Sequence, residues 1–108
     1  MNEISVIKAL SALAQTNRLQ IFRELVQKGT EGMTPALISE SLGLAANTLS
    51  FHLKELMYAD LISQERIGRN LIYRAQYDRM AAVLSFLTQN CCQGEVCELS
   101  TEETCKTC

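Results

Sequence analysis

The first ninety residues of this 108-residue chain contain no cysteine, although free cysteine normally behaves as a small core hydrophobe. The chain also has no apolar run near eighteen residues, so no membrane-spanning helix and no membrane partner are expected. Its first residues lack the charged, apolar and small-residue order of a signal peptide, which predicts a cytoplasmic protein. With one histidine, no carboxylate pair and no phosphate-binding loop, the sequence gives no reason to expect an enzyme.

All five cysteines fall in the last eighteen residues, and this crowding indicates a task for the thiolates themselves. The cytoplasm keeps thiols reduced, and an odd cysteine count fits a disulfide framework poorly. Metal, metalloid or redox chemistry is therefore favoured over structural bridges. The five are Cys91, Cys92, Cys97, Cys105 and Cys108.

The net charge of −2 also divides at this point of the chain. Residues 91–108 hold four glutamates and one lysine, a balance of −3, so residues 1–90 carry +1. We expect residues 1–90 to form one small domain, and residues 91–108 to be a separate acidic, cysteine-rich tail. A domain this small is short of buried area, which favours a homodimer.

Apolar spacing predicts five helices and one hairpin. The expected helices span residues 3–14, 16–28, 35–42, 47–57 and 77–89, and the strands span residues 61–66 and 70–74. Residues 29–32 are expected to be a loop. This order is that of a winged helix-turn-helix, a mainly α fold with a small β-hairpin.

Helix ends and core positions follow from the same pattern. Thr16 or Asn17 is expected to cap the second helix, and Asn47 or its neighbour the fourth. Thr34 is expected to cap the third helix, with Pro35 at the first helical position, where no amide hydrogen is needed. The inward side chains of the third and fourth helices are predicted to be Leu37, Ile38, Leu42, Leu49, Leu53 and Leu56.

Residues 35–57 have helix-turn-helix spacing, in which the second helix places its N-terminal residues against base edges. Small polar side chains there can bond phosphates or bases, Lys54 can neutralise phosphate, and Phe51 can touch a thymine methyl. A plain antiparallel helix pair is the alternative for the segment, and packing under the hairpin or a neighbouring subunit is the alternative for Phe51. The candidate DNA contacts on this helix are Asn47, Thr48, Ser50, Phe51, His52 and Lys54.

Arg69 adds a candidate contact at the hairpin tip, where an arginine can enter a narrow minor groove. Solvated surface charge is the alternative for this residue. His52 lies about 60° from the leucine stripe on a helix that turns 100° per residue. It therefore flanks the core, and a structural histidine competes with the DNA-contact interpretation.

Four segments resemble the ArsR/SmtB family of metal-sensing repressors: residues 10–19, 47–56, 59–62 and 68–73. The resemblance covers residues 4–90. It implies a homodimeric winged-helix repressor that releases operator DNA when metal binds. By position, the resemblance puts Thr48, Ser50, Phe51 and His52 on the recognition helix and Arg69 on the wing.

The sequence departs from one arsenic-sensing subgroup, whose Cys-x-Cys pair precedes the recognition helix, because Ile38–Leu42 contains no sulfur. Another subgroup binds arsenic through cysteines just after the last helix, and Cys91, Cys92 and Cys97 resemble that arrangement. Three thiolates suit arsenite or antimonite as inducer. Gly94 permits the chain to turn back so that Cys97 can join the other two.

Other interpretations of the cysteines stay open. Cys105 or Cys108 would supply a fourth thiolate for zinc or cadmium, which favour four ligands. A thiol redox switch and a small metallochaperone are further alternatives. If the first and last helices form the dimer interface, a ligand at residues 91–97 would change the spacing of the two recognition helices.

Overall fold

The computed structural model describes residues 2–89, so all five cysteines and the inducer site predicted from them lie outside the described residues. The elements follow in the order α1 Glu3–Leu13, α2 Thr16–Lys28, the 3-10 turn η1 Gly29–Glu31, α3 Pro35–Leu42, α4 Ala46–Tyr58, β1 Ile62–Ile67, β2 Asn70–Ala75 and α5 Tyr77–Leu87. The mainly helical fold with one hairpin is confirmed. No helix among residues 2–89 is long and apolar enough to cross a membrane.

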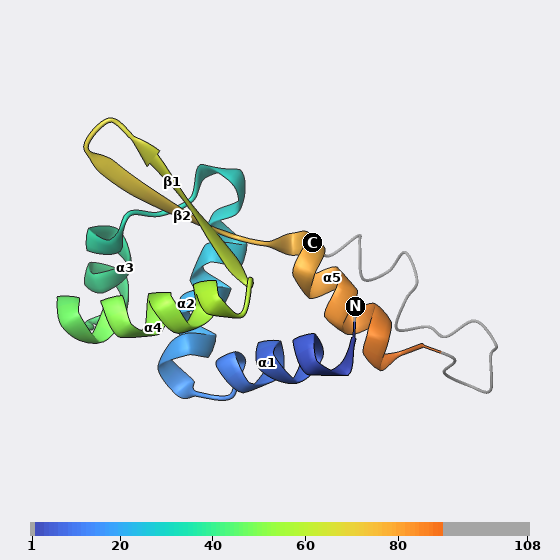
Figure 1. The fold of residues 1–108 in the computed structure, drawn as a ribbon. Helices are drawn as coiled ribbons and strands as arrows, with labels where there is room; N and C mark the ends of the chain where they lie inside the picture. The colour runs from blue at the N-terminus through green and yellow to red at the C-terminus, as the bar shows by residue number, and fades with distance from the viewer. Residues whose placement is uncertain (1, 90–108) are drawn as a thin grey trace.

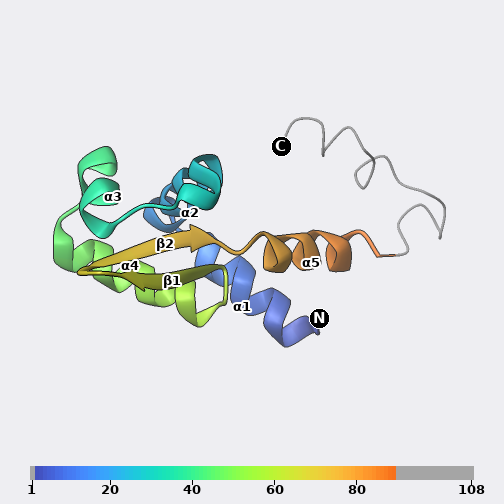
Figure 2. The ribbon, with the colours of Figure 1, turned by 90° about the horizontal axis from the view of Figure 1, so that it is seen from above.

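Most of the helices and the hairpin tip form two groups at opposite ends of the molecule (Figures 1 and 2). Helices α3 and α4 and the hairpin tip lie at one end, and α1 and α5 lie side by side at the other. Helix α2 runs between them and contacts α1, α3, α4 and β2. Two different surfaces are thereby built on one core.

The predicted cap of α3 is confirmed, whereas those of α2 and α4 are wrong. The Thr34 hydroxyl accepts the Leu37 N–H, with Pro35 at the helix start. Helix α2 is capped instead by Gln15, whose side chain accepts the Arg18 N–H at 2.9 Å. Helix α4 begins at Ala46, and its N-cap residue, Ala45, has no side chain that could accept a hydrogen bond. Asn47 therefore lies inside the first turn of the helix and is not its cap.

The core forms where the leucine stripe of α4 packs. Leu49, Leu53 and Leu56 are 1 %, 3 % and 0 % exposed, as predicted. Helix α3 contributes only Ile38 as a buried side chain; Leu42 is partly buried and packs against the core. Leu37 was expected to point inward but is 48 % exposed, because the short helix presents a single side chain to the core.

The hairpin runs antiparallel, in a register from Ile62 opposite Ala75 to Ile67 opposite Asn70. Each strand is within a residue or two of its predicted bounds. Gly68 has φ +63° at the two-residue tip, a conformation that glycine adopts without steric cost and that such tight hairpin loops need. Arg69 follows it, so the fold places this arginine at the tip of the wing.

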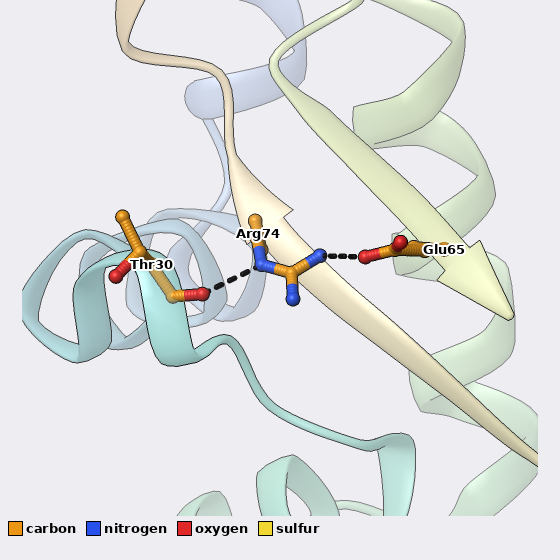
Figure 3. Close-up of polar contacts among 3 residues, drawn as sticks. All are labelled: Thr30, Glu65 and Arg74. Carbon is orange, nitrogen blue, oxygen red and sulfur yellow. Dashed lines mark hydrogen bonds and ion pairs between the residues drawn. The ribbon is translucent and has the colours of Figure 1, made fainter. Parts of the chain in front are cut away.

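The base of the hairpin is tied to the segment after η1. Met33 and Tyr73 exchange both backbone hydrogen bonds, at 3.0 and 2.8 Å, and form an isolated β-bridge beside the two-stranded sheet. Arg74 donates from Nε to the Thr30 carbonyl at 2.7 Å and from Nη1 to Glu65 at 2.7 Å (Figure 3). This arginine therefore fixes the wing to the body of the protein.

Gly32 allows this close approach. Its φ is +69°, and an added Cβ would lie 2.6 Å from Ile72 Cγ2 and 2.8 Å from the Tyr73 carbonyl oxygen. Gly29 has a similar φ of +70° with nothing within 4 Å of the added Cβ. A substitution at either glycine would therefore strain the backbone, but only a side chain at Gly32 would also collide with neighbouring atoms.

We predict that Gly32→Ala lowers the free energy of unfolding by about 1–3 kcal/mol more than Gly29→Ala, because overpacking adds to the backbone strain. Urea denaturation of both variants measures the difference. Equal losses would show that Gly32 is needed for its backbone angles alone.

Candidate nucleic-acid interface

The turn between α3 and α4 is held by hydrogen bonds to Ser39. Gly43 is left-handed, with φ +67°, and its N–H donates to the Ser39 carbonyl at 2.8 Å. The Leu44 N–H donates to the same carbonyl at 3.2 Å, and the Ser39 hydroxyl donates to the Leu44 carbonyl. Leu44 packs against the core. These bonds set the angle at which α4 leaves α3.

Helix α4 presents a polar face opposite its leucine stripe. Phe51 is 56 % exposed and does not pack beneath the hairpin within this chain. The other exposed side chains of this face, as the sequence predicted, are Asn47, Thr48, Ser50 and Lys54. The arrangement offers hydrogen-bonding groups, one aromatic ring and one cation on the same helix.

The wing brings arginine to the same end of the molecule. Arg66 and Arg69 are both exposed, and the hairpin tip lies above α3 at the same end of the molecule in Figure 1. Arg74 is instead held by its bonds to Thr30 and Glu65. A convex helix face with a basic loop beside it is suited to a groove and its phosphates.

His52 lies in the core and has almost no exposed surface for direct DNA contact. It is 6 % exposed, and its Nδ1 lies 3.5 Å from Arg18 Nη1. Burial and the nearby Arg18 charge lower the pKa of His52, against an opposing effect of Glu55. Its inclusion among the DNA contacts is therefore corrected to a structural position. The sequence signal was its place beside the leucine stripe.

Helices α1 and α5 expose large aliphatic side chains at the other end of the molecule. The buried residues of α1 are Val6, Ala9 and Ala12, so its larger residues lie outside the core of the single chain. On α5, Val83 is buried and Met80 partly so. The exposed side chains are Ile4 (77 %), Ile7 (62 %), Leu10 (41 %), Leu84 (51 %) and Leu87 (54 %). Several large aliphatic side chains exposed on two neighbouring helices are typical of a protein-protein interface.

Within residues 2–89, no three histidine, cysteine, aspartate or glutamate side chains gather as a metal site would require. The metal ligands predicted from the sequence, Cys91, Cys92 and Cys97, lie beyond the described part of the chain. The polar face of α4 together with the wing is thus the functional surface that the described residues define.

Comparison with known proteins identifies the same helix-turn-helix segment. Residues 13–65 match the family of helix-turn-helix domains. No match was found among curated proteins. The chain therefore contains a helix-turn-helix domain, and with its hairpin it is a winged helix-turn-helix protein.

Three solved structures specify the kind of winged helix. An ArsR-like transcriptional regulator from Rhodococcus sp. RHA1 is 21% identical, with a TM-score of 0.72 over 80% of this chain and 78% of that one. A homodimeric winged helix-turn-helix DNA-binding domain from Mycobacterium bovis, a possible ArsR-family regulator, is 26% identical, with a TM-score of 0.64 over 87% of each chain. The transcriptional repressor BigR from Xylella fastidiosa is 24% identical, with a TM-score of 0.60 over 82% of this chain and 88% of that one.

The first of these neighbours is described as an ArsR-like regulator and the second as a possible ArsR-family regulator, and the chain shares their winged-helix fold. Together with the helix-turn-helix match, they support a DNA-binding transcriptional regulator of the ArsR type.

Proposed function

We propose that this protein is a metalloid-responsive transcriptional repressor. It binds operator DNA as a homodimer and dissociates when trivalent arsenic or antimony binds the thiolates of Cys91, Cys92 and Cys97. The observation that carries the DNA-binding part is the exposed polar face of α4 beside the arginine-bearing wing. The cysteine cluster in the sequence carries the inducer part.

The geometry supports a two-groove contact. The N-terminal half of α4, with Asn47, Thr48 and Ser50 exposed, enters the major groove, where each base pair presents a distinct hydrogen-bonding pattern. Phe51 meets a thymine methyl and Lys54 a phosphate. Arg69 at the wing tip reaches the adjacent minor groove, whose negative potential attracts arginine. A metallochaperone would have no use for this surface.

The exposed aliphatic faces of α1 and α5 support the homodimer. A two-fold interface buries the same patch of both subunits, and these two helices lie side by side. The Mycobacterium bovis neighbour is described as homodimeric. Pairing through this end places the two recognition helices at the outer ends of the dimer, where they can address successive half-sites.

The order of the chain links the thiols to that interface. Helix α5 ends at Leu87, only a few residues before Cys91. Each thiol that bonds to arsenous acid replaces one hydroxyl group and releases a water molecule, so three thiols complete the coordination of the ion. Closing this site at the end of α5 shifts the dimer helices. A coupling free energy of about 1–3 kcal/mol lowers operator affinity roughly 5- to 150-fold.

We predict that the metalloid-free protein binds a short imperfect palindrome with strong salt dependence, since each basic contact releases counterions. Arg69→Ala should weaken binding to all sequences and reduce the salt slope by about one per subunit. Fluorescence anisotropy across a salt series measures both. Arg23→Ala, an exposed arginine of α2, is the control and should change neither. An affinity that is flat from low to moderate salt would contradict this mode.

We also predict that Ile7→Glu gives a folded monomer, because the side chain is 62 % exposed in one chain but would be buried in the dimer. Its operator affinity should fall more than about tenfold, since two half-sites are no longer held together. Sedimentation measures the assembly. Leu37→Glu, which changes an exposed leucine of α3, should remain dimeric. A dimeric Ile7→Glu protein would move the interface elsewhere.

Serine at Cys91, Cys92 or Cys97 should leave operator binding intact and abolish its release by arsenite, because a soft donor is lost while the winged helix is unchanged. Serine at Cys105 or Cys108 should leave release largely intact. If these two variants lose the response as completely as Cys97→Ser, a four-thiolate zinc-type site is favoured. If no cysteine variant alters release, the cluster is not the sensor.

A further inference from the structure

One arginine of α2 contacts two other helices, α1 and α4, in the middle of the molecule. Arg18 belongs to the first turn of α2. Its Nε donates to the Ala12 carbonyl at 2.7 Å, and Ala12 lies next to the last residue of α1. That carbonyl is among the last of its helix, which have no partner inside the helix and attract a cation. Arg18 Nη1 lies 3.5 Å from Nδ1 of His52 on α4.

The chemistry of this contact fixes the state of the histidine. A guanidinium can only donate hydrogen bonds, so Nδ1 of His52 is the acceptor and the ring proton resides on Nε2. Burial and the Arg18 charge, which both lower the pKa of His52, favour this neutral ring over the opposing effect of Glu55. The 3.5 Å distance is long for such a bond, so a small displacement of either helix makes or breaks it.

The contact continues to the exposed face of the recognition helix. The Phe51 and His52 rings meet edge to face, with centroids 5.5 Å apart and an interplanar angle of 60°. His52 is buried whereas Phe51 is 56 % exposed. A continuous series of contacts thus runs from the Ala12 carbonyl through Arg18 and His52 to Phe51. It begins on the helix whose Ile7 and Leu10 are exposed at the other end of the molecule.

We infer that Arg18 and His52 are positioning residues that couple the end of α1 to the orientation of α4, and so transmit a change at the dimer helices to the DNA-binding face. This inference rests on the proposed function. A ligand acting on the α1 and α5 end moves the Ala12 carbonyl. Because Arg18 follows that carbonyl, its bond to His52 is lost and the Phe51 face is released from its DNA-binding position.

Four variants separate this role from simple filling of space. Arg18→Gln removes the charge, and His52→Leu fills the site without an acceptor. His52→Asn restores an acceptor near the position of Nδ1. Arg23→Gln, at an exposed position further along α2, is the matched control. Operator affinity is measured for each purified dimer with and without arsenite, and thermal denaturation confirms that each is folded.

We expect Arg18→Gln and His52→Leu to lower metalloid-free operator affinity at least about tenfold and to reduce the arsenite-induced change in affinity at least about fivefold. His52→Asn and Arg23→Gln should stay within about twofold of wild type. The variant that combines Arg18→Gln with His52→Leu should bind the operator no more weakly than either single variant, because both substitutions remove the same contact. Variants that lose thermal stability yet keep wild-type affinity and arsenite response would overturn the inference.

His52 is the only histidine of the chain, so its ring resonances provide a second readout that does not depend on DNA or metalloid. In wild type, nitrogen NMR should show the Nε2-protonated ring with a pKa below the usual 6.5. Arg18→Gln should raise that pKa and shift the Phe51 ring resonances, whereas Arg23→Gln should do neither. An unchanged Phe51 ring in Arg18→Gln would overturn the coupling.

The two hypotheses fail differently. If wild type binds the operator but ignores arsenite, the inducer assignment fails, and the metalloid-free affinities of Arg18→Gln and His52→Leu still test the link between α1 and α4. If wild type binds no operator, the proposed function fails as a whole. The Phe51 ring resonances of Arg18→Gln then still test whether Arg18 and His52 couple α1 to α4.

Discussion

Burial of the leucine stripe of α4 is the constraint on which the rest of the structure depends. Leu49, Leu53 and Leu56 are almost fully buried, and each contributes roughly 1.5–3 kcal/mol on leaving water. Because a helix turns about 100° per residue, fixing these three side chains inward forces the polar side chains and Phe51 outward. The DNA-binding face therefore follows directly from core packing. It cannot rotate without exposing leucine.

The wing depends on a second, smaller set of contacts. The backbone pair between Met33 and Tyr73 and the bond from Arg74 to the Thr30 carbonyl tie the base of the hairpin to the segment that follows α2. The second bond of Arg74 goes to Glu65 on β1 and links the two strands of the hairpin. The Arg74–Glu65 ion pair lies near the surface, where such pairs contribute little to stability, so its value is geometric. With its base fixed, the short hairpin holds Arg69 at a defined place relative to α4.

The end formed by α1 and α5 has the opposite character. The aliphatic residues left uncovered there are as large as those in the core, which explains why a chain of this size would form a dimer. Arg18 and His52 lie between this apolar end and the DNA-binding face. A polar contact between helices is well suited to transmission, since its geometry is more specific than that of apolar packing.

The sequence by itself determined the order of the helices and strands and, to within two residues, their bounds, because apolar periodicity and the signals at Thr34 and Pro35 act within a few residues. It also supplied the cysteine cluster, which remains a prediction from residue type and spacing. The sequence did not predict Gln15 and Ala45 as caps, because the geometry of the preceding turn sets where each helix begins, and residues with better capping side chains lie one or two positions later.

Only the tertiary structure decided what lies between elements. It exposed Leu37, left Ile4 and Ile7 outside the core, and assigned Arg74 to the base of the wing. It also moved His52 from the candidate DNA contacts into the core beside Arg18, thirty-four residues earlier in the chain. Periodicity tells which residues share a face of one helix. Which neighbouring element meets that face depends on how all the helices pack at once, and no local signal records it.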